Sequence, residues 1–414
     1  MALPSILGAD LVPVECWDYR VPDIVHGLAA AFASQARTQG LHLDGLDDCI
    51  PVRSARCAIV MALKALGLPA GARIAAPLYC CPVVFKAIRA AGMSVRFIDV
   101  EADGFCMSAD DLQAKRKDCD AVIAVHTFGQ ICDMRALMST GLPVIEDCAQ
   151  AIGSSAHGTP AGGFGDVAVF SFRSGKYLSV GEGGALHARD RALHSALRSR
   201  AAELPTPSLM DQAVHVGRTW LRSALRSRPL WGLVGERLWE AHGRSTEFSA
   251  QTPIVMSRIF RADLRIVRDR LARLPEAVER QRSHAQWLAQ HLRADACLHP
   301  GEPRGQRCNR YLYPLLLRTR AQRDRMAQQL RRAGIGTIAP YKDSAVLAAR
   351  HFGYSGDCPH AESVAERVLV PPSSHVLGQR DLERIAHAFN EACRALSMAT
   401  PGALRPRLAA EQVE

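Results

Sequence analysis

The fold is decided by four short stretches: VIEDCAQA at 144–151, FGD at 164–166, FSFRSGK at 170–176 and GEGG at 181–184. The first and third belong to apolar segments, Pro143–Ile145 and Val167–Phe172, that predict short strands and run into polar residues. In parallel sheets the functional residues gather just beyond the carboxyl ends of the strands. We therefore expect the polar residues after these two strands to lie at one edge of a sheet.

The sequence on both sides of these stretches alternates strand and helix patterns. Arg73–Ala76, Ser94–Val100 and Ala121–Val125 predict strands, whereas Ala55–Leu66 and Pro82–Ala91 predict helices. Strands separated by helices are typical of βαβ units. The fold class is therefore expected to be α/β, with a mainly parallel central sheet in a large domain.

The back part of the chain is rich in helix patterns. Arg261–Leu292, Ala321–Ala333 and Arg380–Leu396 predict helices, and Tyr311–Leu317 predicts a strand. This indicates a smaller C-terminal α+β domain at 256–398. Residues 1–255 form the large cofactor-binding domain in this interpretation, and 399–414 form a flexible tail.

A helical insertion rich in Trp and Arg is expected at about 201–252. It holds Trp220, Trp231 and Trp239, and Thr219–Ala241 predicts one or two basic amphipathic helices. Such helices also suit an anionic membrane surface. Packing on the protein's own core or on a partner subunit is the favoured interpretation.

Composition narrows the classes of function. The 414 residues carry a formal net charge of +10, but no zinc finger, RNA-binding sheet motif or recognisable helix-turn-helix accompanies this charge, so a nucleic-acid partner is not expected. The 13 cysteines are irregularly spaced without a CxxC pair, which favours reduced thiols and gives no metal site. Acidic residues close after the first apolar stretch do not fit a signal peptide, so a cytoplasmic protein is expected.

The residues at the two strand ends suit pyridoxal phosphate. This cofactor needs an amine for its aldehyde, an acid for its ring nitrogen, a donor for its phenolic oxygen, and donors for its phosphate. Lys176 supplies an amine, and Asp147, Gln150 and Ser171 supply the other groups. Partial desolvation of Lys176 would lower its pKa and make it a better nucleophile.

These stretches, in this order and spacing, resemble the DegT/DnrJ/EryC1/StrS family of pyridoxal-phosphate-dependent sugar aminotransferases. The resemblance continues upstream through HTFGQ at 126–130 and downstream through RRAGIGT at 331–337, and covers residues 20–398. It implies the fold type I aminotransferase architecture and a homodimer. It matches least in 201–252 and at the termini.

The resemblance assigns roles to individual residues. Lys176 resembles the lysine that holds the cofactor as a Schiff base and moves protons, and Asp147 the acid on the ring nitrogen. Gln150 resembles the residue beside the phenolic oxygen, and Ser171 a phosphate-binding hydroxyl. The remaining assignments are the phosphate turn Ala55, Arg56 and Cys57, the ring-facing position Cys81, a supporting His126, and the substrate-pocket residues Tyr341 and Lys342.

Three positions depart from the family pattern. The usual Ser-Gly-Thr of the phosphate turn is Ser54-Ala55-Arg56, where Arg56 offers a charged donor in place of the Thr hydroxyl. Cys81 stands where an aromatic ring usually stacks on the cofactor. Ile259 stands where the partner subunit usually sends an Asn to the phosphate.

Three functions stay open on these residues. The first is transfer of an amino group from an amino acid, with glutamate the expected donor, to a keto-sugar that carries a nucleotide in many family members. The second keeps the cofactor but performs elimination or carbon–carbon bond chemistry. Family dehydratases usually have His at the position of Lys176, which argues against that one reaction. The third is a non-catalytic or regulatory relative.

Overall fold

The computed structural model describes residues 11–14, 21–32, 40–225, 253–293 and 295–398. An eight-stranded sheet forms its centre, in the order β1-β2-β10-β9-β6-β5-β3-β4. These strands are β1 (Leu41–Leu43), β2 (Leu46–Val52), β3 (Arg73–Pro77), β4 (Ser94–Ile98), β5 (Ala121–Val125), β6 (Val144–Asp147), β9 (Val167–Ser171) and β10 (Gly184–Ala188). The run from β4 to β9 is parallel, which confirms the α/β class with a mainly parallel sheet.

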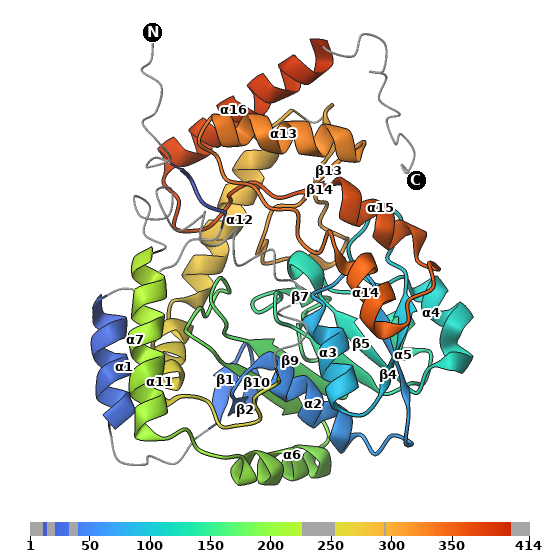
Figure 1. Ribbon diagram of the computed structural model, residues 1–414, viewed down its shortest axis with the longest axis vertical. Coiled ribbons are helices and arrows are strands. Elements are labelled where there is room, and N and C mark those ends of the chain that lie inside the picture. The colour runs from blue at the N-terminus through green and yellow to red at the C-terminus, as the bar shows by residue number, and fades with distance from the viewer. Residues whose placement is uncertain (1–10, 15–20, 33–39, 226–252, 294, 399–414) are drawn as a thin grey trace.

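Helices cover both faces of this sheet and build the outer layers (Figure 1). The α-helices of the described residues are α1 (Val21–Phe32), α2 (Ala55–Ala65), α3 (Val83–Ala90), α4 (Ala109–Lys115), α5 (Met134–Met138), α6 (Arg191–Glu203), α7 (Leu209–Leu225), α11 (Arg261–Leu271), α12 (Leu274–His291), α13 (Arg320–Arg332), α14 (Ser344–Phe352), α15 (Pro359–Arg367) and α16 (Gln379–Met398), and of these α13 and α16 pack on the smaller C-terminal sheet. Two 3-10 turns lie at Arg116–Asp118 and Thr127–Gly129.

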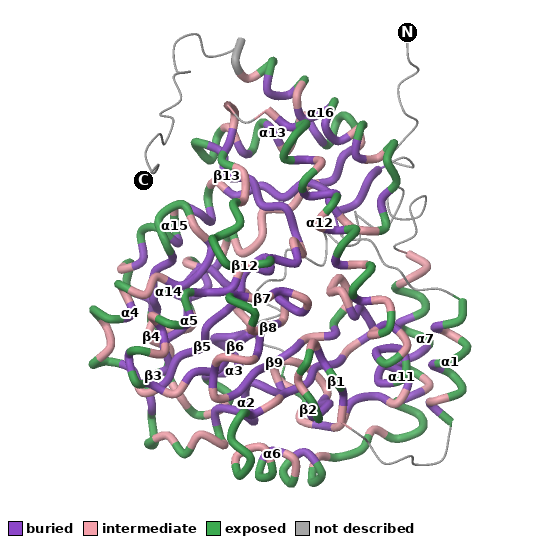
Figure 2. Tube along the Cα trace, turned by 180° about the vertical axis from the view of Figure 1, so that it is seen from behind, coloured by how far each residue is buried: buried purple, intermediate pink, exposed green. Residues whose placement is uncertain are grey.

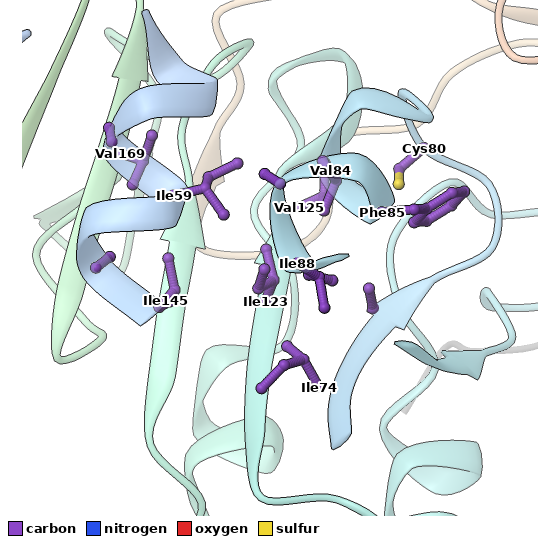
Figure 3. Close-up of a cluster of buried hydrophobic side chains, with 14 of the residues drawn as sticks. Ile59, Ile74, Cys80, Val84, Phe85, Ile88, Ile123, Val125, Ile145 and Val169 are labelled. Atoms are coloured by element: carbon purple, nitrogen blue, oxygen red, sulfur yellow. The ribbon is translucent and has the colours of Figure 1, made fainter. Parts of the chain in front are cut away.

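Side chains along the buried strands point alternately to the two faces of the sheet, where they pack in two separate cores. Ile123 and Val125 of β5 point to the face covered by α2 and α3, as Figure 3 shows, whereas Val122 and Ala124 point to the opposite face. Both faces are buried, so β5 is apolar at every position. The sheet is therefore the middle layer of a three-layer unit.

A second, smaller sheet lies toward the C-terminal end of the molecule. It consists of the antiparallel strands β11 (Cys297–Leu298), β13 (Leu315–Leu317) and β14 (Val368–Leu369). Buried residues of α12, α13 and α16 pack with this sheet in a core of their own. The N-terminal segment reaches the same core, because Val12 pairs with Ile335. Figure 2 shows this group at the top, above the buried strands of the large sheet.

A third, minor sheet joins the two parts of the chain. It contains β7 (Ser155–Ala156), β8 (Thr159–Pro160) and β12 (Gln306–Arg307). The division at residue 255 stays a prediction, since α11 packs in the core of the large sheet while the far half of α12 packs in the C-terminal core.

Several elements differ from the sequence-based expectation. The single helix expected at Arg261–Leu292 is two helices, because Pro275 lies in the first turn of α12 and cannot donate a hydrogen bond to the preceding turn. The strand expected from Tyr311 begins at Leu315, since Tyr311 and Leu312 form a bend and Pro314 has no amide hydrogen for strand pairing. The antiparallel strands β1, β2 and β10 were not expected.

The predicted insertion and tail are described only in part. Within 201–252, helix α7 follows the end of α6, and residues 226–252 lie outside the described residues, as does the tail 399–414. Among the residues that are described, no helix is both long and apolar enough to cross a membrane.

Candidate active site

The carboxyl edge of the parallel strands brings the predicted polar residues together. Asp147 ends β6, where it pairs in register with Val125 of β5 and Val169 of β9. His126 follows β5 directly, and Ser171 is the last residue of β9. Since neighbouring parallel strands end at the same edge, three strands deliver functional groups to one place.

Asp147 lies deep in this edge. Its side chain is buried, and its Oδ1 accepts a hydrogen bond of 3.0 Å from the Ala149 amide. Burial raises the pKa of Asp147, while the Ala149 amide and the positive charge of Lys176 act in the opposite direction. A carboxylate in this environment is stabilised by any further cationic partner, such as a protonated ring nitrogen.

Lys176 lies in the turn that follows β9. It is half-buried, and its Nζ sits over the ring of Tyr311, 4.5 Å from the ring centroid. A cation over an aromatic face is stabilised by the ring quadrupole. The positive charge of Lys176 also acts to lower the pKa of Asp147. Lys176 therefore lies near the buried end of β6.

Gln150 is fixed by two hydrogen bonds from opposite parts of the chain. Its Oε1 accepts from the Phe128 amide at 3.0 Å, and its Nε2 donates to the Tyr341 hydroxyl at 2.8 Å. Tyr341 has a left-handed φ of 58°, and its ring packs edge-on against Tyr79 at 5.5 Å. The predicted pocket residue Tyr341 therefore touches Gln150, whereas Lys342 is exposed and its side chain is not part of this buried group.

His126 belongs to a fully buried polar cluster behind Asp147. Its Nε2 lies 3.0 Å from a carboxylate oxygen of Glu146, and its Nδ1 accepts from the Cys132 amide at 3.3 Å. Glu146 also accepts from the amides of Gly162, Phe164 and Gly165. These bonds fix the turn between β8 and β9.

The same cluster has the composition of a metal site. Ligand atoms of His126, Glu146 and Cys148 lie within 4.8 Å of one another. Burial raises the pKa of the Cys148 thiol to about 12, so this group is protonated at neutral pH. The hydrogen bonds of His126 and Glu146 account for their burial without an ion.

The predicted phosphate turn begins helix α2. Ser54 is the N-cap residue, and its Oγ accepts from the Cys57 amide at 3.2 Å. Gly184 pairs with Ser171 on one side and Val52 on the other, and a Cβ added at Gly184 would lie 2.5 Å from the Ala55 nitrogen. The Ser171 end of β9 and the amide-rich start of α2 therefore adjoin, as an anion site requires.

Positively charged side chains lie around the start of α2. Burial and the neighbouring charge of Arg173 lower the pKa of Arg56, and Arg56 contributes to the lowered pKa of the buried Lys86. Cys81 is half-buried and lies near Arg56. Ile259 is buried within its own chain, close to Gly183 and Phe172.

The sequence interpretation missed two residues of this region. Tyr311 contacts the Lys176 ammonium, and Asn309 is fully buried, with its Nδ2 donating to the backbone oxygens of Gln150 and Ile152 at 2.8 Å. Both come from a turn that is distant in sequence. The positive φ at Arg310 between them was not visible as a Gly or Asn signal.

Comparison with known proteins identifies the family. The DegT/DnrJ/EryC1/StrS aminotransferase family matches residues 41–390, which is most of the chain. The chain belongs to this family. It is a pyridoxal-phosphate-dependent aminotransferase. The buried acid, the half-buried lysine, and the cationic helix start fit the ring nitrogen, aldehyde and phosphate of that cofactor.

Individual relatives match over different lengths. GDP-perosamine synthase of Vibrio cholerae is 36% identical over 138 residues, which are 32% of this chain and 38% of that enzyme. UDP-N-acetyl-3-dehydro-alpha-D-glucosamine 3-aminotransferase of Acidithiobacillus ferrooxidans is 27% identical over 362 residues, 86% of either chain.

Solved structures share the fold. The aminotransferase TlmJ from Streptoalloteichus hindustanus superposes with a TM-score of 0.74 at 24% identity, over 93% of this chain and 100% of that one. A putative sugar aminotransferase from Streptococcus pneumoniae in its PMP form gives the same TM-score and coverage at 17% identity.

Proposed function

We propose that this enzyme transfers an amino group from an amino acid, with glutamate as the donor, to a nucleotide-linked keto-sugar. Relatives that align over most of their length are named for UDP- and dTDP-linked keto-sugar substrates. The observation that carries the proposal is the meeting of Asp147, Gln150 and Lys176 at one sheet edge. A transaminase needs an acid, a hydrogen-bond donor and an amine in that arrangement.

Each residue has a distinct task in this proposal. Pyridoxal phosphate, when bound, supplies a conjugated ring that accepts the electron pair left as a substrate carbon loses its proton. Asp147 holds the ring nitrogen in its protonated form, and Gln150, locked by Phe128 and Tyr341, contacts the phenolic oxygen. Lys176 would hold the cofactor through its amine, and the same amine would take up and return a proton.

The phosphate end is assigned to the start of α2. The amides of Ala55 and Arg56, the Arg56 guanidinium and the Ser171 hydroxyl bind the phosphate in this proposal, with the helix dipole favouring the anion. Arg56 takes the place of the usual Thr hydroxyl with a charge-assisted donor. Cys81 lines the same corner as the ring-facing residue, and His126 supports Asp147 from behind.

An absorbance titration tests the cofactor residues. Protein reconstituted with pyridoxal phosphate is expected to show a visible band that Lys176→Ala lacks, because the lysine amine forms the chromophore. Lys176→Arg is the matched control, since it keeps the positive charge but cannot form the same bond. A band of equal position and intensity in Lys176→Ala would contradict the assignment.

The substrates are tested in two half-reactions. Glutamate alone is expected to bleach the visible band, and a UDP- or dTDP-linked keto-sugar added afterwards is expected to restore it. Restoration by pyruvate but by no keto-sugar would overturn the proposed acceptor. Failure of glutamate, glutamine and alanine to bleach the band would argue against transamination altogether.

We also propose that the enzyme is a homodimer with two equal sites about a two-fold axis. Light scattering of the reconstituted enzyme is expected to give the mass of two chains. A monomer with full activity would contradict this.

A further inference from the structure

Helix α7 has an unusual distribution of side chains. It buries the polar residues Gln212, His215 and Thr219 and exposes apolar ones, among them Met210 and Val214. Burying polar groups costs free energy unless they are hydrogen-bonded. The inward face of α7 is therefore suited to specific polar contacts more than to apolar packing.

Among these residues, His215 contacts a carboxylate of α11. His215 Nε2 lies 2.7 Å from Oδ2 of Asp263, which is itself buried. The same carboxylate accepts from the amides of Gly181 at 3.2 Å and Glu182 at 2.9 Å. Asp263 therefore holds the GEGG turn on one side and α7 on the other.

Close packing adds to these bonds. A Cβ added at Gly181 would lie 2.4 Å from Thr219 Oγ1 and 2.5 Å from His215 Nε2, so the backbone of the turn fits directly against α7. The His215 ring stacks on Phe260 with 3.7 Å between the ring centroids. The Arg53 guanidinium lies 3.8 Å from the centroid of the Phe260 ring.

The chain of contacts ends at the phosphate turn. Glu182 Oε2 accepts from Arg53 Nε at 2.6 Å, and Arg53 immediately precedes Ser54, the N-cap of α2. The Arg53 amide also donates to the Ser257 oxygen at 3.1 Å. The path from His215 to Ser54 is thus continuous.

We propose that His215 is a positioning residue for the cofactor phosphate. We name the path His215, Asp263, Gly181, Glu182 and Arg53 the α7 clamp. It fixes the start of α2 and the strand pair beside Ser171 in the geometry that binds a phosphate, and so gives the 201–225 segment a role in cofactor retention. The inference rests on the proposed assignment of the phosphate to Ala55, Arg56 and Ser171.

Paired titrations with pyridoxal phosphate and with pyridoxal, which lacks the phosphate, test the clamp. His215→Ala is expected to weaken binding of pyridoxal phosphate about tenfold, equivalent to about 1.4 kcal/mol, and to leave pyridoxal binding unchanged. His215→Gln is expected to retain most of the affinity, because its Nε2 can donate to Asp263. A general loss of structure would weaken both ligands together.

Controls keep the outcomes distinct. Val216→Ala trims a buried apolar contact of the same helix without touching the clamp, and is expected to leave the ratio of the two affinities unchanged. Glu182→Gln weakens the hydrogen bond between residue 182 and Arg53, so it is expected to lower the affinity for pyridoxal phosphate relative to the affinity for pyridoxal. This variant replaces His215→Ala as the test if His215→Ala fails to fold.

Two results would overturn the inference: an unchanged ratio in a folded His215→Ala variant, or an unchanged ratio in Glu182→Gln. A wild-type enzyme that binds pyridoxal as tightly as pyridoxal phosphate would instead refute the phosphate assignment itself.

Discussion

The carboxyl group of Asp147 is held where its negative charge is disfavoured. Burial raises its pKa, and the Ala149 amide and Lys176 offset only part of that effect. A carboxyl group whose pKa is raised in the folded protein stabilises the folded state at pH values below its pKa in the unfolded chain. This contribution is lost as the pH rises through the pKa of the folded state. At neutral pH, Asp147 therefore costs stability in the cofactor-free protein.

Asp147→Asn is expected to stabilise the cofactor-free protein by about 1 kcal/mol at neutral pH. The gain shrinks as the pH falls toward 3.8, the ordinary value for Asp, because the wild-type group is then uncharged as well. Activity falls roughly 100-fold, a loss typical of removing one electrostatic partner of the reacting groups. Thermal unfolding across a pH series measures the first effect. A gain independent of pH would contradict the charge argument.

Single residues differ in how far the sequence predicts them. The placement of Asp147, Gln150 and Lys176 at or just beyond the ends of two strands was predictable, because both strands and the spacing between them are visible in the sequence. The contact between Gln150 and Tyr341 spans 191 positions, and the ring under Lys176 comes from Tyr311. Contacts of this kind depend on how distant turns meet, and no local pattern carries that information.

At the scale of elements, Gly184 lets two strands and a helix meet. It pairs with both β2 and β9, and the nearest atoms to a Cβ there are backbone atoms of Ser54, Ala55 and Phe170. Backbone atoms in a sheet and at a helix start cannot rotate away as a flexible side chain can. The absence of a side chain is therefore what allows the phosphate turn to approach β9.

Gly184→Ala is expected to destabilise the protein by about 1–3 kcal/mol, the usual cost of inserting a methyl group into a packed core. It is also expected to weaken cofactor binding, because the start of α2 must shift. Gly217→Ala is the matched control, since Gly217 lies in α7 with nothing within 4 Å of an added Cβ. There, Ala is expected to stabilise the helix by about 0.5–1 kcal/mol. Urea unfolding of both variants measures the contrast, and equal stabilities would contradict it.

Helices and strands with a clear periodic pattern of apolar residues were predicted well. Elements that bury polar residues or contain residues disfavoured in strands were not. Strand β5 was expected at its observed bounds because both its faces are apolar. Helix α7 follows a different rule, since three of its four buried residues are Gln212, His215 and Thr219, which an amphipathic pattern assigns to solvent. The antiparallel strand β2 contains Asp47, Asp48 and Pro51, residues that disfavour strand prediction.

At the scale of the molecule, C-terminal helices complete the core of the large sheet. Residues of α14 and α15, including Ala348 and Val364, pack in the same cluster as α2 and α3. Ser344 Oγ also donates to the Cys80 oxygen at 3.0 Å, beside Cys81. The end of the chain thus supports the face on which the candidate site is built.

The buried carboxylate of Asp99 makes one such junction, which yields a test of this architecture. Asp99 follows β4, and its oxygens accept from the amides of His360 at 3.0 Å and Ala361 at 2.7 Å, so it caps α15 across more than 260 positions. Asp99→Ala is expected to cost about 2 kcal/mol, because the cap is lost and the buried amide of Ala361 is left without an acceptor. Asp99→Asn keeps one acceptor oxygen and is expected to lose less. Urea unfolding of the cofactor-free protein measures both, and if α15 were dispensable to the large sheet, Asp99→Ala would leave the unfolding midpoint unchanged.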